Sequence, residues 1–344
     1  MTVIGSRPAT PVIALHLERD TLWALDQTLL PFVEHELALH SASEVAAAIR
    51  GLSIRGAPLI GVAAAYGIAL ELALEPSPAA LERACQVLVG ARPTAVNLAW
   101  AANRVRTAAL AGPPDGMAAR ALVQARAIHA REEAASAAIA RHGAALLAGA
   151  RRILTHCNTG ALAAPGRGTA LAVIAELHEQ GRLQEVLATE SRPLLQGARL
   201  TVYELSRLGV EHRLIVDSAA AGLIAAGAAD AVIVGCDRVA ANGDVANKVG
   251  TYGLALAAQA AGIPFVVAGP TSTIDPDCPT GAEIEIEERA ADEVRSVAGH
   301  RLTVPGASCR NPAFDVTPAA LVTALVTDGG TARPVDADAI SALR

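Results

Sequence analysis

The sequence predicts a two-domain α/β protein, in which a mostly helical N-terminal domain with a small β-ribbon precedes a C-terminal Rossmann-like parallel sheet with helices on both faces. Three observations support this prediction. The chain has 344 residues, which is long for one domain. Helical patterns dominate the first part, and from Arg151 short apolar runs alternate with helical segments. We therefore expect domains at 1–147 and 148–344, with the reactive groups on the second.

Local patterns define the first elements of the N-terminal domain. Apolar and polar residues alternate around Leu22–Leu25, which predicts an antiparallel ribbon within residues 10–40. Ser41 and Glu44 have the spacing of a capping box, so a helix is expected to begin there and to end near Arg50.

Buried and amphipathic helices follow. The uncharged run Ala57–Leu70 is shorter than the roughly 20 residues that span a bilayer, and it predicts a buried helix with Pro58 at its first position. Arg55 precedes this helix start and could hold an anion, although a surface arginine is an equal alternative. Arg92 precedes a proline and is expected to be extended, with a structural role the simpler interpretation. Further helices are expected at 77–90 and 117–147.

Composition and charge exclude several classes of protein. The net charge is −6 and no basic run is present, which argues against a nucleic-acid partner. The N-terminal sequence lacks the basic region and long apolar run of a signal peptide, and the five cysteines are widely spaced without a C-x-x-C pair. We expect a cytoplasmic protein that acts on small molecules, without a membrane partner, a cofactor or a metal.

Short apolar runs in the second half predict the strands of a parallel sheet. These runs are Ile153–Thr155, Val186–Ala188, Leu214–Val216, Ala231–Val234 and Phe265–Ala268. Right-handed crossovers would bring all their carboxyl ends to one edge, where open α/β sheets bind ligands. The reactive residues that follow these strands, of which one or two are expected to be structural caps, are Cys157, Glu190, Asp217 and Asp237.

The stretch from Ala231 to Gly253 is the most informative part of the chain. Its strand is predicted to stop at a polar turn that lasts until an alanine-rich helix begins near Gly250. Donors between a buried strand and a helix N-terminus suit a small anionic ligand. Lys248 is the only lysine among 28 basic residues, which indicates a need for a compact point charge, with accidental survival of one lysine as the alternative.

Other kinds of site are disfavoured. A dinucleotide site after the first strand could use Gly166 and Gly168, but the third glycine of the G-x-G-x-x-G pattern is missing. The nine histidines contain no H-x-x-x-H or H-x-H pair that would indicate a metal, and no G-x-S-x-G motif indicates a serine hydrolase. His156 precedes Cys157 directly, and strand neighbours point in opposite directions, so we expect a core or supporting imidazole.

A thiol and a carboxyl at nearby strand ends remain, with arginines and one lysine to hold an anion. Asp237 follows four apolar residues, and burial would raise its pKa so that it could donate a proton near neutral pH. Cys157 lies near a helix start and could be a partial thiolate, with an inert buried cysteine as the equal alternative. This pair suits proton transfer on a phosphorylated small molecule.

A series of motifs occurs in one order along nearly the whole chain. The motifs are Ile54–Pro58, Arg92–Leu98, His156–Gly160, Arg192–Pro193 with Gln196–Thr201, Gly235–Val239, Asn247–Tyr252 and Asn311–Pro318. Together they resemble the methylthioribose-1-phosphate isomerases. The same fold occurs in the regulatory subunits of the translation initiation factor 2B exchange factor, of the alpha/beta/delta-like family, and in ribose-1,5-bisphosphate isomerase.

The resemblance implies an activity and a set of site residues. The activity is the aldose to ketose conversion of 5-methylthio-D-ribose 1-phosphate to 5-methylthio-D-ribulose 1-phosphate in methionine salvage, by a homodimer without a cofactor. Asp237 would be the proton donor, and Cys157 would stabilise the transition state. The implied substrate contacts are Arg55, Gly56, Ala57, Arg92, Gln196, Asn247 and Lys248. Cys236 and Ser191 stand where Ala and Thr are common, which leaves the preferred 5-substituent open.

The implied chemistry leaves alternatives open. Phosphate on the anomeric oxygen prevents a free aldehyde, so the ring would open by protonation of its oxygen before hydrogen moves from C2 to C1, as a proton or as a hydride. A related enzyme for 5-deoxyribose 1-phosphate or ribose 1,5-bisphosphate would have nearly the same anion contacts. A non-catalytic regulatory subunit on the same scaffold is the alternative of another class, although a binding protein would need neither Cys157 nor Asp237.

Overall fold

The computed structural model describes residues 12–92 and 95–344, and Pro93 and Thr94 of the predicted Arg92–Leu98 motif lie outside these residues. The described chain divides into two compact units. One contains residues 12–137 and Gly160–Gly168, and the other contains Ala138–Thr159 and Thr169–Arg344. The expected domain boundary at 147/148 stays a prediction.

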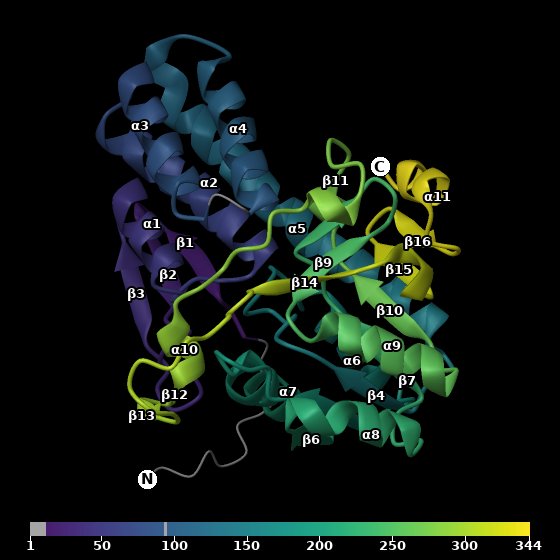
Figure 1. Ribbon diagram of the computed structural model, residues 1–344. Helices are drawn as coiled ribbons and strands as arrows, with labels where there is room; N and C mark the ends of the chain where they lie inside the picture. Colours follow the sequence, from purple (N-terminus) through teal and green to yellow (C-terminus); the bar gives the residue numbers. More distant parts are fainter. Residues whose placement is uncertain (1–11, 93–94) are drawn as a thin grey trace. The chain divides into compact units, whose positions relative to one another are not determined.

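The first unit contains the expected ribbon and helices. Its strands β1 (Leu15–Glu18), β2 (Thr21–Leu25) and β3 (Glu36–Leu39) form an antiparallel sheet in sequence order (Figure 1). The helices are α1 (Ala42–Arg50), α2 (Ala57–Leu74), α3 (Pro78–Val89), α4 (Val96–Leu110), the short η1 (Pro114–Gly116) and most of α5 (Met117–Leu146). The capping box at α1 is confirmed, since Ser41 Oγ accepts from the Glu44 backbone N–H at 3.2 Å.

Helix α2 is the core of this unit. Among the described residues it alone is long and apolar enough to cross a membrane by length and composition, with a mean hydropathy of 1.8, but 83% of it is buried inside the protein. A helix that is apolar all round belongs inside a core, so the predicted buried helix is confirmed. Pro58 occupies its second position rather than the first, because Ala57 already begins the helix.

The second unit is built on a seven-stranded sheet with the order β16-β15-β10-β7-β4-β5-β6 (Figure 1). Its strands are β4 (Arg152–Thr155), β5 (Glu185–Thr189), β6 (His212–Ile215), β7 (Ala231–Val234), β10 (Phe265–Ala268), β15 (Ala324–Thr327) and β16 (Gly330–Ala332). All neighbours are parallel except β15 and β16. This is the strand order of a Rossmann sheet, in which the direction of winding reverses between β4 and β7.

Helices cover both faces of this sheet because its strands are apolar on both sides. On one face Ile153 and Ile233 pack against the end of α5, against α6 (Ala170–Glu179) and against α7 (Val202–Leu208). On the other face Leu154 and Val232 pack against α8 (Ala220–Ala225), α9 (Thr251–Ala261) and α11 (Ala337–Ala342). Neighbouring residues of one strand therefore belong to different cores, as the strand period of two requires.

The polar turn expected after Val234 is instead a β-hairpin. Its strands β8 (Arg238–Ala240) and β9 (Val245–Lys248) join β11 (Ile274–Asp275) and β14 (Phe314–Thr317) in a four-stranded sheet of order β11-β8-β9-β14. Gly243 turns the hairpin with a φ of 88°. Asn-Gly between two strands is a strong hairpin signal, and the prediction overlooked it because the strands have only three and four residues.

Between Glu288 and Pro312, which form an isolated antiparallel bridge, the chain makes a long detour that we call the 288–312 excursion. It contains α10 (Ala291–Arg295) and the two-stranded ribbon of β12 (Ser296–Val297) and β13 (His300–Arg301). The remaining short helical turns are η2 (Gly197–Thr201), η3 (Asp217–Ala219), η4 (Thr271–Thr273), η5 (Gly281–Glu283) and η6 (Ala319–Leu321).

Candidate active site

The predicted thiol and carboxyl follow the two strands that flank the reversal in the sheet. Strands β4 and β7 are paired, with Thr155 opposite Ile233. Cys157 and Asp237 come two and three residues after these strands, and both are half-buried. The two turns touch, because a Cβ atom on Gly235 would lie 2.7 Å from Thr159 Cγ2. The point of reversal is where open α/β sheets bind ligands, so both groups lie where a substrate is expected.

The turn at Cys157 is held from neighbouring strand ends. Cys157 has a left-handed φ of 61°, which few residues other than glycine adopt. Its N–H donates to Ser191 Oγ at 2.8 Å, and its carbonyl accepts from Thr201 Oγ1 at 2.5 Å. Hydrogen bonds to the N–H and to the carbonyl of the same residue stabilise a backbone conformation that costs on the order of 1–3 kcal/mol. The position of Cys157 therefore depends on the segment that follows β5.

Asp217 is a structural cap. One carboxylate oxygen accepts from the Ser191 N–H at 2.8 Å and the other from the Arg192 N–H at 2.7 Å. This carboxylate fixes the turn after β5 and, through Ser191, the thiol turn. The expectation that one or two of the strand-end groups are caps is confirmed for Asp217.

His156 is a buried, supporting imidazole. Its Nε2 lies 2.9 Å from the Val249 carbonyl oxygen, which only accepts, so this nitrogen carries the proton. Nδ1 then accepts from Thr189 Oγ1 at 2.6 Å, and Thr189 Oγ1 lies 3.2 Å from Ser191 Oγ. A chain of hydrogen bonds thus links the residue after Lys248 to the thiol turn. Within the described residues no group of His, Cys, Asp and Glu side chains could hold a metal.

The pH dependence of stability should report this imidazole. Burial holds the pKa of His156 below its usual 6.5, with Lys248 acting in the same direction and Asp217 opposing it. The unfolded chain therefore binds the proton first, and stability is lost as the pH falls below 6.5. We expect His156→Gln to show a smaller fall in Tm between about pH 7.5 and 5.5 than the wild type. A fall equal to that of the wild type would contradict this. His129→Gln removes a half-buried imidazole whose pKa burial also lowers, so it should reduce the fall in the same direction.

Gln196 offers a buried acceptor. It precedes η2 and is 8% exposed, and its Oε1 is a buried side-chain oxygen without a hydrogen-bond partner in the described structure. An unpaired buried carbonyl costs about 1–3 kcal/mol. A sugar hydroxyl that donates to Oε1 would recover that free energy on binding, which fits the predicted substrate contact.

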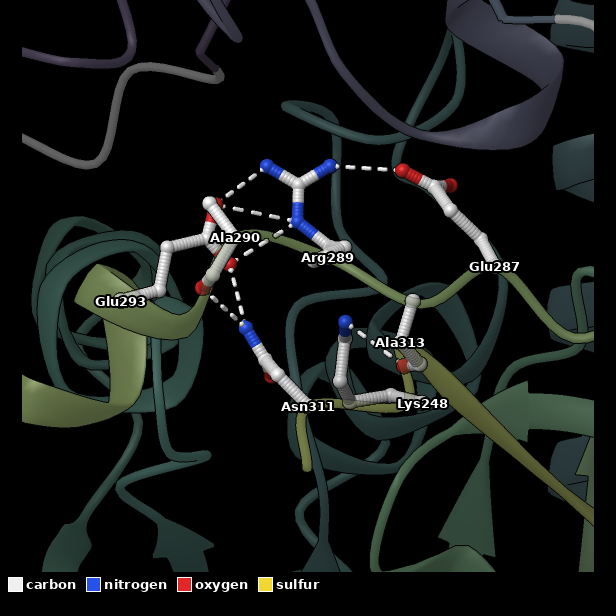
Figure 2. A network of polar contacts seen from close by, with 7 residues as sticks. All are labelled: Lys248, Glu287, Arg289, Ala290, Glu293, Asn311 and Ala313. Atoms are coloured by element: carbon white, nitrogen blue, oxygen red, sulfur yellow. Dashed lines mark hydrogen bonds and ion pairs between the residues drawn. The ribbon is translucent and has the colours of Figure 1, made fainter. Parts of the chain in front are cut away.

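Asn247 and Lys248 lie on strand β9 rather than in the expected loop. Asn247 Nδ2 donates to Thr251 Oγ1 at 3.0 Å. Lys248 is buried, and its Nζ donates to the Ala313 carbonyl at 3.0 Å (Figure 2). The same nitrogen lies 5.2 Å from the Phe314 ring centre. Among the described residues no carboxylate pairs with this ammonium within 4.0 Å, so its charge can serve an anionic ligand.

The start of α9 is already capped. The carboxylate of Asp315 accepts from the Gly250 N–H at 2.7 Å and from the Tyr252 N–H at 3.1 Å. Burial raises the pKa of Asp315 although these bonds and Lys248 oppose it. The carboxylate of Asp315 therefore occupies the anion site that was expected at this helix start. Within the stretch Ala231–Gly253, Lys248 is the residue that remains to bind an anion.

Four predicted contacts lie in the other unit. Arg55 is buried, and its Nε donates to Gln27 Oε1 at 2.9 Å. Gly56 has a φ of 98°, and a Cβ atom there would lie 2.5 Å from Ala163 Cα, so only glycine fits. Ala57 is the first residue of α2, and Arg92 is half-buried in the turn before α4. Arg55, Gly56 and Ala57 are consecutive, so a bound group could meet the arginine beside a helix start.

Cys236 stands directly before Asp237. Its Sγ lies 3.4 Å from Thr273 Oγ1. Burial raises the pKa of this thiol to about 12, with the Asp237 charge acting in the same direction. Cys236 therefore stays protonated near neutral pH and does not act as a second thiolate.

Comparison with known proteins agrees with this fold and arrangement. The sequence model of the initiation factor 2 subunit family, IF-2B, matches residues 53–334, and the chain belongs to this family. Within the family the chain is 52% identical over 325 residues to "Methylthioribose-1-phosphate isomerase" of Anaeromyxobacter sp. (strain K), covering 94% of each chain. The protein of the same name from Parasynechococcus marenigrum is 49% identical over 324 residues, covering 94% of this chain and 95% of that one.

Solved structures show the same likeness. The crystal structure of 5-methylthioribose 1-phosphate isomerase from Pyrococcus horikoshii OT3 superimposes with a TM-score of 0.90 at 38% identity, covering 98% of this chain and 96% of that one. The translation initiation factor eIF-2B subunit delta from A. fulgidus follows with a TM-score of 0.84 at 36% identity, covering 96% and 99%. The fold predicted from the sequence is confirmed by both.

Proposed function

We propose that this chain is an aldose to ketose isomerase that converts 5-methylthio-D-ribose 1-phosphate to 5-methylthio-D-ribulose 1-phosphate in methionine salvage. The observation that carries the proposal is an identity of 50–52% over nearly the whole chain to three proteins named methylthioribose-1-phosphate isomerase. A thiol and a carboxyl at touching turns beside the reversal of the sheet support it.

The proposed chemistry needs an acid and a site from which water is excluded. Asp237 donates a proton to the ring oxygen, the bond from that oxygen to C1 breaks, and the oxygen leaves as a hydroxyl. Hydrogen then moves from C2 to C1, and the C2 hydroxyl releases its proton as the carbonyl forms, so protons balance. Cys157 stabilises the species between these steps, and the apolar ends of β4 and β7 keep water away from it.

The proposed substrate contacts are the residues that the matched motifs carry. Gln196 offers its buried oxygen and Lys248 its unpaired charge, with Asn247 beside the lysine on β9. The further proposed contacts are Arg55, Gly56, Ala57 and Arg92. A lysine and two arginines are the residues expected for a phosphate.

Substitution of Lys248 tests whether phosphate binding needs a compact charge at this position. We expect Lys248→Arg to bind the sugar phosphate about tenfold more weakly, because the larger planar fork cannot keep the bond to the Ala313 carbonyl in a buried position. Titration calorimetry measures the affinity. Arg213→Lys, at a surface ion pair with Glu185, is the control and should bind normally. Unchanged affinity of Lys248→Arg would contradict the argument.

Turnover of the substrate tests the proposal directly. Purified protein incubated with 5-methylthio-D-ribose 1-phosphate should form the ketose, detected by NMR as a new C2 carbonyl. A higher kcat/KM with ribose 1,5-bisphosphate or 5-deoxyribose 1-phosphate would assign the related isomerase instead. Binding without any ketose would favour the regulatory subunit, which the likeness to the eIF-2B delta subunit keeps as the second candidate.

The proposal also includes an oligomeric state and a cellular location. We infer a homodimer, which sedimentation at two protein concentrations tests, and a cytoplasmic location, which agrees with five cysteines of which none forms a disulfide in the described structure.

A further inference from the structure

The 288–312 excursion is closed at its neck by a half-buried polar network (Figure 2). Arg289 donates to Glu293 through Nε at 3.0 Å and pairs with Glu287 at 2.9 Å. Asn311 is 3% exposed, and its Nδ2 donates to the Ala290 carbonyl at 2.9 Å and to Glu293 at 3.0 Å. Such a satisfied network rigidifies the two ends of the excursion.

The neck also holds a predicted site residue. The Ala313 N–H donates to the Glu287 carbonyl at 2.8 Å, which fixes the peptide whose own carbonyl accepts from Lys248 Nζ at 3.0 Å. Figure 2 shows the ammonium directed at this carbonyl beside the network. The position of the Lys248 charge therefore depends on how the excursion begins and ends.

Arg192 ties the body of the excursion to the other predicted site residue. Its guanidinium donates to the Val294 carbonyl at 2.9 Å through Nη2 and to the Ser296 carbonyl at 3.2 Å through Nη1. Its backbone N–H is held by Asp217, beside the serine whose Oγ accepts from the Cys157 N–H. One residue thus connects α10 and β12 to the thiol turn.

We propose that Arg192 is a positioning residue that makes the 288–312 excursion a common support for Cys157 and Lys248. The inference rests on the proposed function, since it concerns the same site. Hydrogen bonds from a charged donor are roughly twice as strong as neutral ones, and here they hold an excursion whose other residues, apart from Asn311, are half-buried or exposed. The planar fork reaches two carbonyls at once, which a lysine ammonium on a flexible stem does less well.

The excursion supplies a matched control. Arg295 also donates to a carbonyl, from Nε to Ala307 at 2.7 Å, and it pairs with Asp292 at 3.1 Å. Both of its partners belong to the excursion itself. Arg295→Met should loosen the excursion and leave the thiol turn unchanged. Arg192→Met should loosen the excursion and also alter the thiol turn.

Three measurements on the full chain test the inference. Hydrogen exchange reports the order of residues 291–310, the iodoacetamide reaction of Cys157 followed on its own peptide reports the thiol turn, and kcat and KM report the site. We expect Arg192→Met to raise exchange, to change the alkylation rate about threefold or more, and to lower kcat/KM about tenfold or more, through a lower kcat from Cys157 and a higher KM from Lys248. Arg192→Lys should recover part of each effect, and Arg295→Met should raise exchange only.

The outcomes separate the inference from the proposed function. Wild-type protein without turnover would remove the isomerase proposal, while the alkylation rate would still test Arg192. Arg192→Met with higher exchange but with alkylation and kcat/KM like the wild type would overturn the inference. An equal effect of Arg295→Met on Cys157 would overturn it too. If Arg192→Met does not fold, Arg192→Lys decides, since normal values on all three measurements would contradict the role.

Discussion

Asp237→Asn is expected to lower kcat by about 10²–10⁴-fold, the range that general acid catalysis contributes, while the sugar phosphate still binds. Asparagine keeps the size of the side chain and its place beside the Cys157 turn, but it has no acidic proton to give to the ring oxygen. The backbone of Asp237 is held independently, since its N–H donates to the Ala246 carbonyl at 3.0 Å. Turnover and calorimetric affinity measured on the same preparation separate the two effects.

Asp244→Asn is the matched control for this variant. Asp244 lies on the same hairpin, and its carboxylate accepts from the backbone N–H groups of Ala319 at 2.9 Å and Gly281 at 3.0 Å. In the asparagine variant an NH2 group replaces one carboxylate oxygen and faces a backbone N–H, which is also a donor. The free energy of unfolding should therefore fall by about 1–3 kcal/mol, with little change in kcat. Asp237→Asn with kcat near the wild-type value would reject Asp237 as the proton donor.

The parts of the fold that the sequence predicted are those that depend on neighbouring residues. Strands β7 and β10 have the predicted bounds, because four apolar residues between an aspartate or a proline and a glycine define a buried strand by themselves. Helix α1 follows from the Ser41 cap in the same way. The pairing of β9 with β14 joins residues more than sixty positions apart, and no local pattern indicates it. Asn247 and Lys248 were therefore expected in a loop.

The residues of the candidate site also differ in whether a local sequence pattern locates them. Cys157 and Asp237 could be located because each follows its strand by a few residues, and the order of strands then places them together. The partners that hold the thiol turn come from separate segments, namely Ser191, Thr201 and Asp217. Neither these bonds nor the Arg192 contacts with the excursion have a sequence signal, because they arise only when the segments have packed.

Gly197→Ala is expected to lower the free energy of unfolding by about 3 kcal/mol and Tm by about 4 °C, with loss of activity. A Cβ atom at this position would overlap the Thr189 carbonyl oxygen and lie 2.9 Å from Ser191 Oγ. The first atom is backbone at the end of β5, which cannot yield as the tip of a flexible side chain can, and the second belongs to the turn that follows β5. The first turn of η2 would have to move away from the strand.

That movement would reach the site by two routes. Ser191 Oγ accepts from the Cys157 N–H, and Thr201, at the end of η2, donates to the Cys157 carbonyl. Gly253→Ala on α9 is the control, because a Cβ atom there meets nothing within 4 Å, so Tm should stay equal or rise slightly. Thermal unfolding and kcat of both variants give the comparison. A Gly197→Ala protein with wild-type Tm and kcat would mean that the end of β5 can shift without moving the thiol, and the support described for Cys157 would then be wrong.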